Sequence, residues 1–298
     1  MVLIPDLRSC VAALPIFVMC LCATARAEGY GELTIGSGPD AYRSHALRAS
    51  VDLFTYPAQA NFDLFRAKEG DVEVMRQSGV GLRGDFNHSL SGNYRYSKTS
   101  DTVFEVSGNE VGLSASFNQF WQSPLRTAID LGYGAFDYRL SARLSANTAL
   151  AALIPDQKRA SLGISQDISP TVAIYASHDQ YQYTRDPAIP ARLLLQRSRN
   201  TSSVAFTLLS FPDNTNSIGL TWTPQETLTL DIAYSITNTF LRQQSSLQLG
   251  ADYQFSNRLN FAATLTRSNN SVVKMTNGRT LLNATQATYV DVSAGLVF

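Results

Sequence analysis

The chain has 298 residues and carries 24 basic and 24 acidic side chains, so its formal net charge is zero. A neutral chain gives no electrostatic argument for nucleic-acid binding, because the phosphate backbone requires a basic surface. The three cysteines, Cys10, Cys20 and Cys22, all lie near the N-terminus. The rest of the chain therefore excludes disulfides, thiolate metal sites and cysteine nucleophiles.

Residues 1–27 have the features of a secretory signal peptide. Arg8 precedes an almost unbroken apolar run over 11–23, and Ala25 and Ala27 place small residues where signal peptidase requires them. The run is short for a transmembrane helix, which makes an N-terminal anchor the weaker alternative. We therefore expect the signal peptide to end at residue 27 and the mature chain to be exported.

The mature chain, residues 28–298, alternates apolar with small or polar residues, as strands with one apolar and one polar face do. Six pairs of such segments are joined by short turns: 47–54 with 62–66, 80–86 with 89–96, 111–117 with 127–135, 161–166 with 172–177, 217–223 with 228–236, and 247–255 with 259–265. Strands at 30–36 and 287–298 complete the set. The sequence predicts an all-β fold, a transmembrane antiparallel up-and-down β-barrel of about 14 strands, within a range of 12 to 16.

Longer polar stretches separate the hairpins, and short turns alternating with long loops are typical of outer-membrane barrels. We expect outer loops at 68–75, 99–108, 141–157, 185–214 and 269–285, with one short link at 239–243. The mature prolines fall in the turns and loops, and none lies inside a proposed strand. Residues 203–211 are ambiguous, because they alternate enough to form a further strand or could extend an outer loop.

Aromatic residues favour a membrane barrel over a soluble β-sandwich, because they collect near the strand ends as two interfacial girdles. The girdle at the short turns would contain Phe54, Phe86, Phe117, Trp121, Trp222, Phe255 and Phe298. The girdle at the opposite ends would contain Tyr94, Tyr96, Tyr138, Tyr183 and Tyr234.

The C-terminal segment carries the most specific signal. It begins at Tyr289, has apolar residues at alternate positions that include Val290, Val292 and Leu296, and ends on Phe298. These residues resemble the β-signal of Gram-negative outer-membrane proteins, which the barrel-assembly machinery recognises. The resemblance implies a porin-like barrel in the cell outer membrane of a Gram-negative bacterium.

No catalytic constellation is recognisable. The three histidines, His45, His88 and His178, lack the partners and spacing of the outer-membrane proteases and phospholipases. No glycine-rich phosphate loop, metal-ligand cluster or nucleotide motif occurs either. We expect a protein that is not an enzyme and that has no cofactor.

Charged residues that share the inward-facing parity of the proposed strands are the candidate lumen lining. They are Arg48, Asp52, Asp63, Arg83, Asp85, Arg95, Glu110, Arg126, Asp130, Arg159, Asp179, Asp231, Asp252, Arg258 and Asp291. Such residues would line a hydrated channel or lock a closed interior with salt bridges, and a barrel of fourteen strands favours the open reading. The predicted function is an outer-membrane channel for small hydrophilic solutes or the conduit of an exopolysaccharide export system. The alternative is a structural or adhesive barrel without transport activity.

The expected partners are outer-membrane lipid, lipopolysaccharide, the barrel-assembly machinery and, for the conduit, a polysaccharide-export complex. Basic residues on the loop side favour lipopolysaccharide phosphates as ligands. They are Arg185, Arg192, Arg197 and Arg199 in one loop, together with Lys68, Lys98, Lys158 and Lys274. The alternative for these side chains is an ordinary solvated surface.

Overall fold

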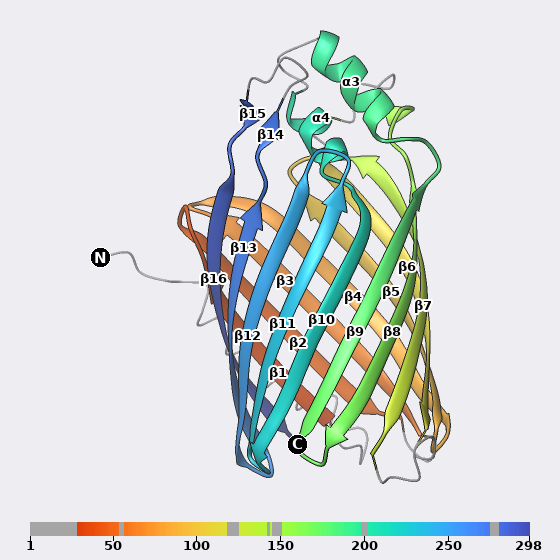
Figure 1. The fold of residues 1–298 in the computed structure, drawn as a ribbon, viewed down its shortest axis with the longest axis vertical. Coiled ribbons are helices and arrows are strands. Elements are labelled where there is room, and N and C mark those ends of the chain that lie inside the picture. Colours follow the sequence, from red (N-terminus) through yellow and green to blue (C-terminus); the bar gives the residue numbers. More distant parts are fainter. Residues whose placement is uncertain are drawn as a thin grey trace.

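In a computed structural model, the chain forms a closed barrel of fourteen antiparallel strands, with a small two-stranded sheet at one end (Figure 1). The structure describes residues 29–53, 57–117, 125–141, 144, 151–197, 202–274 and 280–298. The signal peptide proposed for 1–27 lies outside the described residues.

Each barrel strand pairs with its neighbours in the chain, and β16 closes the barrel by pairing with both β13 and β1. The barrel strands are β1 (Gly29–Ser37), β2 (Tyr42–Asp52), β3 (Ala58–Glu69), β4 (Val72–Asn87), β5 (Leu90–Asp101), β6 (Phe104–Phe117), β7 (Thr127–Leu140), β8 (Gln157–Ser169), β9 (Val172–Tyr183), β10 (Pro212–Gln225), β11 (Leu228–Thr239), β12 (Gln243–Ser256), β13 (Leu259–Asn270) and β16 (Thr285–Val297). The predicted fold class and strand number are confirmed, and all six predicted hairpins form.

Two expected loops are wrong. Residues 68–75 and 99–108 belong mostly to strands, and the chain turns only at 70–71 and 102–103. Polar residues continue these strands because they pair with each other across the ladder: Arg66 forms an ion pair with Glu73, and Lys98 lies 3.9 Å from Glu105. Polarity was therefore a poor indicator of a loop at these positions.

Proline placement also differs from the expectation in one strand. Pro212 is the first residue of β10, and Pro224 is the second-last, within the register shift between Trp222 and Gln225. A strand tolerates proline at its first residue and at an irregularity, because no ladder hydrogen bond is lost there. The barrel accommodates both residues without a break in the wall.

The segment 203–211 is not a strand. It contributes to α4 (Ser202–Leu209), which follows α3 (Ala188–Arg197) in the link from β9 to β10. The Asp186 carboxylate accepts a hydrogen bond of 2.8 Å from the Ala188 backbone N–H, and Pro187 lies between them, so α3 has both an N-terminal cap and a helix-compatible first residue. No helix in the described part of the chain has the length and apolar character needed to cross a membrane.

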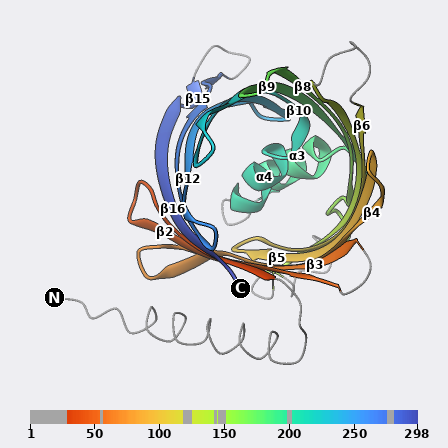
Figure 2. The same cartoon turned by 90° about the horizontal axis from the view of Figure 1, so that it is seen from below.

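The barrel has two unlike ends. We call the end with the short turns and the C-terminus the turn end, and the opposite end the loop end (Figure 1). The loop end carries α3, α4 and the small hairpin of β14 (Val273–Lys274) and β15 (Thr280–Leu282). Seen along the barrel, α3 and α4 lie within the outline of the wall, so they cover part of the mouth (Figure 2).

Candidate functional site: the inner face of the barrel

The inner face of the wall can be assigned from the helices that cover the mouth. Phe104 of β6 pairs with Leu140 of β7, and both belong to one buried hydrophobic cluster with Val204 and Leu208 of α4. Paired residues of antiparallel strands point to the same face, and the face alternates along each strand. The register therefore carries this assignment from β6 and β7 around the whole barrel.

On this basis thirteen of the fifteen charged residues expected in the lumen lie on the inner face: Arg48, Asp52, Asp63, Arg83, Asp85, Arg95, Glu110, Asp130, Arg159, Asp179, Asp231, Asp252 and Asp291. Arg126 lies just before β7, where its backbone N–H donates to the Asp167 carboxylate at 3.1 Å, and Arg258 lies in the β12–β13 turn. Sequence analysis missed Glu32 of β1, which pairs with Arg48. Its parity within β1 was the signal that could have found it.

Four charged residues form a continuous chain along the inner face from β3 to β8. Arg95 donates to the Asp63 carboxylate at 2.8 Å and lies 4.0 Å from the Glu110 carboxylate. Arg159 donates to the other oxygen of Glu110 at 3.0 Å, and its guanidinium also lies 5.9 Å from the ring centroid of Phe136. The carboxylates of Asp63 and Glu110 are therefore each balanced by an arginine.

Glycines in the intervening strands make these long contacts possible. In β7, Gly134 pairs with both Glu110 and Arg159, so the ion pair passes directly over it. A Cβ at Gly134 would lie 3.4 Å from Cγ of Glu110 and 2.7 Å from the Phe136 ring. In β4, Gly79 occupies the corresponding position beneath the Asp63 carboxylate, which a Cβ would overlap. The charged side chains therefore lie flat along the wall instead of projecting across the lumen.

The wall from β9 to β13 and β16 also carries inward-facing carboxylates, but with neutral partners. Tyr175 reaches across β10, above Gly219, and its hydroxyl lies 3.2 Å from both carboxylate oxygens of Asp231. The Thr221 hydroxyl donates to the same carboxylate at 3.0 Å. In β16, Asp291 lies beside Ser44 above Gly36 of β1.

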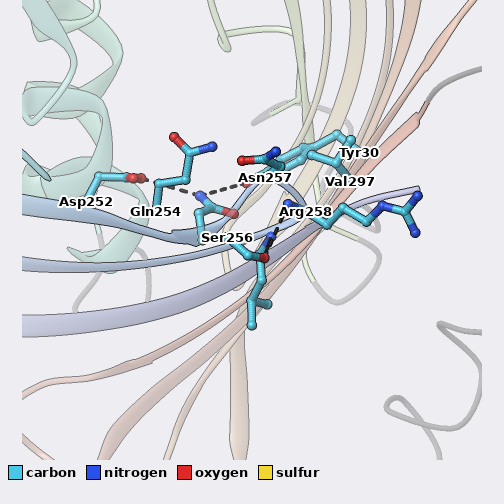
Figure 3. Close-up of a pocket in the computed structure, with 9 residues that line it drawn as sticks. Tyr30, Asp252, Gln254, Ser256, Asn257, Arg258 and Val297 are labelled. Atoms are coloured by element: carbon cyan, nitrogen blue, oxygen red, sulfur yellow. Dashed lines mark hydrogen bonds between the residues drawn. The ribbon is translucent and has the colours of Figure 1, made fainter. Parts of the chain in front are cut away.

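Asp252 extends this arrangement toward the turn end (Figure 3). The Asn260 amide nitrogen lies 3.4 Å from the Asp252 carboxylate and 3.5 Å from the Tyr30 hydroxyl. These residues line a shallow pocket at the β12–β13 turn, and the Arg258 side chain points away from Asp252 (Figure 3). Arg258 therefore does not neutralise Asp252.

We call β2–β8 the arginine wall and β9–β13 with β16 the aspartate wall. The inward-facing arginines of the arginine wall are Arg48, Arg83, Arg95 and Arg159. No Arg or Lys faces inward from the strands of the aspartate wall, all of whose residues are described, since its one basic residue, Arg267, pairs with Leu247 on the outer face. The two walls adjoin at the β8–β9 pair and are separated on the other side by β1.

The side chains that the structure describes do not fill the interior of the barrel body. Inward-facing charged residues such as Arg48, Arg83, Asp130 and Asp252 remain exposed, whereas a packed interior would bury them. The fully buried large side chains that the structure describes belong to the loop end, among them Phe104, Val204 and Leu208. The packed core of this protein therefore lies at the mouth, above an accessible lumen.

An aromatic cluster anchors the helices at that mouth. The ring centroids of Tyr138 and Phe211 are 4.9 Å apart, and the Tyr183 ring stacks on Phe211 at 5.6 Å. The Tyr183 hydroxyl donates to the Pro212 carbonyl at 2.5 Å. Tyr138 and Tyr183 were expected in the outer girdle, which is wrong: both face inward, because α4 brings an apolar surface inside the barrel.

The outer face carries an apolar band that ends in aromatic residues toward the turn end. Large apolar side chains such as Leu64 and Ile218 are 55% and 61% exposed there, which in water would be costly but in lipid is favourable. Trp222, Phe255 and Phe86 are also exposed near the turns. Phe54 and Trp121 of the expected girdle lie outside the described residues.

The C-terminal segment closes the barrel. Val290, Val292 and Leu296 face outward and are exposed, while Tyr289 faces inward and packs edge-on against Tyr42. The last residue, Phe298, exchanges two backbone hydrogen bonds of 3.0 Å with Gly29, the first residue of β1. The terminal phenylalanine thus completes the seam between the first and last strands.

The described residues contain no group of three or more His, Cys, Asp or Glu side chains placed to hold a metal ion. No protein-family model and no curated protein sequence matches the chain. Among solved structures, the CymD monoaromatic hydrocarbon channel is similar with a TM-score of 0.52 and 10% identity, over 91% of this chain and 88% of that one.

Two further solved structures are similar at lower scores. The KdgM porin has a TM-score of 0.44 and 9% identity, over 90% of this chain and 99% of its own. The outer-membrane protein Omp33 of Acinetobacter baumannii has a TM-score of 0.46 and 9% identity, over 91% of this chain and 98% of its own. At such identities the likeness concerns the fold alone, which is a closed antiparallel β-barrel.

Proposed function

We propose that the protein is an outer-membrane channel of a Gram-negative bacterium that passes small hydrophilic solutes through the barrel lumen. The observation that carries this proposal is the exposure of the inward-facing charges, Arg48, Arg83, Asp130 and Asp252 among them. A structural barrel with a closed interior would bury such groups against partners, because unpaired charges are costly away from water. Here they remain accessible, which fits a water-filled passage.

The flat course of the polar side chains supports the same proposal. The ion pair of Glu110 and Arg159 lies over Gly134, and the contact of Tyr175 with Asp231 lies over Gly219. In these contacts the polar groups bind partners on nearby strands of the same wall, and not partners on the opposite side of the lumen. A fourteen-stranded barrel is wider than the eight-stranded barrels that side chains can fill, and this arrangement keeps its centre free.

The helices α3 and α4 form the proposed constriction. They pack on one side of the mouth, against Phe104, Leu140 and the aromatic cluster around Phe211. Solutes would enter beside the helices and then pass the charged inner face. The passage carries out no reaction and needs no cofactor.

The lumen should prefer cations over anions. Arg95 and Arg159 of the arginine wall bind carboxylates, whereas Asp179, Asp231, Asp252 and Asp291 of the aspartate wall face no inward basic residue on their own strands. Salt screens fields beyond about 10 Å at 0.1 M, so the preference should be moderate.

Single-channel recording in planar lipid bilayers tests the proposal. The refolded mature chain should give stable open-channel currents, and a variant in which a short Gly-Ser linker replaces residues 188–209 should give a larger conductance. Different mobility of boiled and unboiled samples on a denaturing gel is the control that both proteins are folded barrels.

The outcomes separate the remaining functions. Folded protein that passes no current with or without residues 188–209 would favour the structural or adhesive alternative. A silent full-length protein whose linker variant conducts would favour a gated conduit, such as one for exopolysaccharide export. Open currents from the full-length chain would support the channel.

A further inference from the structure

Five basic residues meet on the outer face of three neighbouring strands, close to the loop end. The register of β2, β3 and β4 places His45 beside Arg66 and Arg66 beside Arg76, in one row across the strands. Arg43 and Lys68 form the next pair toward the loop end. We call Arg43, His45, Arg66, Lys68 and Arg76 the basic patch.

The basic patch lies directly at the border of the apolar band. The next outward-facing row toward the turn end contains Leu47 and Leu64, and the row after it contains Ala49, Phe62 and Val80. Leu64 and Val80 are exposed on the outer face. A ligand that covers both rows and the patch must therefore be amphiphilic, with an anionic head and apolar chains.

Acidic residues leave most of the patch uncompensated. Glu73 forms an ion pair with Arg66, whereas Arg43, Lys68 and Arg76 make no ion pair with any described residue. The outer face of β5–β8 differs at the same height. There Lys98 forms an ion pair with Glu105, and Glu105 is also the cross-strand neighbour of Arg139. Asp137 places a second carboxylate on this part of the outer face.

We propose that the basic patch binds the phosphorylated sugar head group of an outer-leaflet glycolipid. Arginine forms strong charge-assisted hydrogen bonds with phosphate. Neighbouring strands lie about 4.8 Å apart, so the row from His45 to Arg76 spans roughly 10 Å. That width suits two phosphates on a rigid disaccharide better than the single phosphate of a glycerophospholipid, and the acyl chains would lie over Leu64 and Phe62.

The site differs from the one that the sequence suggested. Arg185 of the β9–β10 link donates to the Ala152 carbonyl at 2.6 Å, Arg192 is exposed on α3, and the side chains of Arg197 and Arg199 lie outside the described residues. Lys68, Lys98 and Lys158 lie in strands rather than loops, and the Lys274 side chain is not described. The concentration of charge is on β2–β4, away from the helices.

Native mass spectrometry of the refolded mature chain in neutral detergent, titrated with bisphosphorylated lipid A, tests this proposal. The wild-type barrel should bind one lipid A saturably. The double substitution Arg43→Gln/Arg76→Gln should weaken binding by about tenfold or more, because it removes two charge-assisted contacts. The double substitution Arg139→Gln/Lys158→Gln removes two charges from the outer face of β7 and β8 and should leave binding unchanged.

Equal weakening by both double substitutions would overturn the proposal in favour of general charge attraction. So would the absence of saturable binding, or equally tight binding of phosphatidylglycerol. The inference depends on the proposed outer-membrane placement with the loop end outside, but not on conduction. Bilayer currents from the Arg43→Gln/Arg76→Gln variant show independently whether the channel function holds, because neither residue faces the lumen.

Discussion

The arginine wall and the aspartate wall have the same fold and different electrostatic character: the first has both charge signs on its inner face, and the second has carboxylates without Arg or Lys. In the arginine wall, Asp63 and Glu110 are bonded to Arg95 and Arg159 at 2.8 and 3.0 Å. In the aspartate wall, Asp231 is bonded to the hydroxyls of Tyr175 and Thr221. Hydrogen bonds from neutral donors orient a carboxylate but leave its charge in place.

The two walls hold their polar side chains in place in different ways. In the arginine wall, the ion pairs of Arg95 and Arg159 with Asp63 and Glu110 hold these side chains against the wall without creating a strong field. The aspartate wall uses tyrosine, threonine, serine and asparagine for the same purpose, and its negative charge remains available to ions. Net charge alone, which is zero for the chain, does not reveal this division.

The largest expected effect comes from opening the seam between β16 and β1, which lies between the two walls. Deleting Phe298 removes both of its backbone hydrogen bonds to Gly29 and the ring that covers Gly29. We expect a several-fold loss of heat-modifiable barrel in the outer membrane, measured on gels of membrane fractions. The substitution Phe298→Ala keeps the backbone bonds, and a defect equal to that of the deletion would assign the effect to the aromatic ring alone.

Neutralising the aspartate wall should produce the next largest effect. In water, a carboxylate about 10 Å from the ion path changes the local cation concentration about twofold, before screening. The triple substitution Asp231→Asn/Asp252→Asn/Asp291→Asn should therefore clearly reduce the cation preference, as measured by reversal potentials. Asparagine retains the hydrogen-bonding shape, so the barrel should still fold.

The matched control neutralises an ion pair of the arginine wall. Glu110→Gln/Arg159→Gln removes one charge of each sign from a pair separated by 3.0 Å. It should leave ion preference nearly unchanged. If this control shifts the reversal potential as much as the triple substitution does, the contrast between the walls is incorrect.

A smaller effect should follow from adding a Cβ at Gly219, which lies beneath the contact between Tyr175 and Asp231. A Cβ at Gly219 would overlap the Tyr175 ring, whereas a Cβ at Gly250 would lie 3.5 Å from Cβ of Asp231, an ordinary contact. Gly219→Ala should cost about 1–3 kcal/mol in unfolding free energy, and Gly250→Ala about 0.5 kcal/mol or less. Urea titrations in detergent would measure both free energies. Equal midpoints for the two variants would argue that the Tyr175 side chain does not lie over Gly219.

The smallest expected effect is the release of one carboxylate in the arginine wall. Arg159→Gln leaves Glu110 with Arg95, 4.0 Å away, as its remaining basic neighbour. Cation preference should increase by about twofold or less. The two side chains are 33% and 20% exposed, so solvent screening limits the stability loss to about 1 kcal/mol or less. An unchanged or reduced preference would show that Glu110 does not face the ion path.

The strands and their inner faces could be predicted because alternation has a period of two and short turns fix the register. Asp231 and Asp252, for example, lie on neighbouring strands on the same face, as their parity indicated. The contacts that pass over Gly134 and Gly219 could not be predicted. They join residues of the two strands on either side of each glycine, and the sequence alone does not show which residues these are.

The helices at the mouth were missed for a different reason. Residues 203–211 show partial alternation, but Val204, Ala205, Leu208 and Leu209 also repeat at the spacing of one helical face, and all four are buried. A short apolar segment satisfies both patterns. Tyr138 and Tyr183 were then misplaced, because nothing in a strand's own sequence shows that an inserted helix makes its inner face apolar.

The reversal potential of the wild-type channel between unequal KCl solutions directly measures whether the lumen conducts and whether it prefers cations. We expect an open channel whose reversal potential has the sign of potassium preference, is moderate in size and decreases as the salt concentration rises. A reversal potential of the opposite sign would contradict the role of the aspartate wall. The absence of current from folded, membrane-inserted barrels, with or without residues 188–209, would contradict the accessible lumen itself.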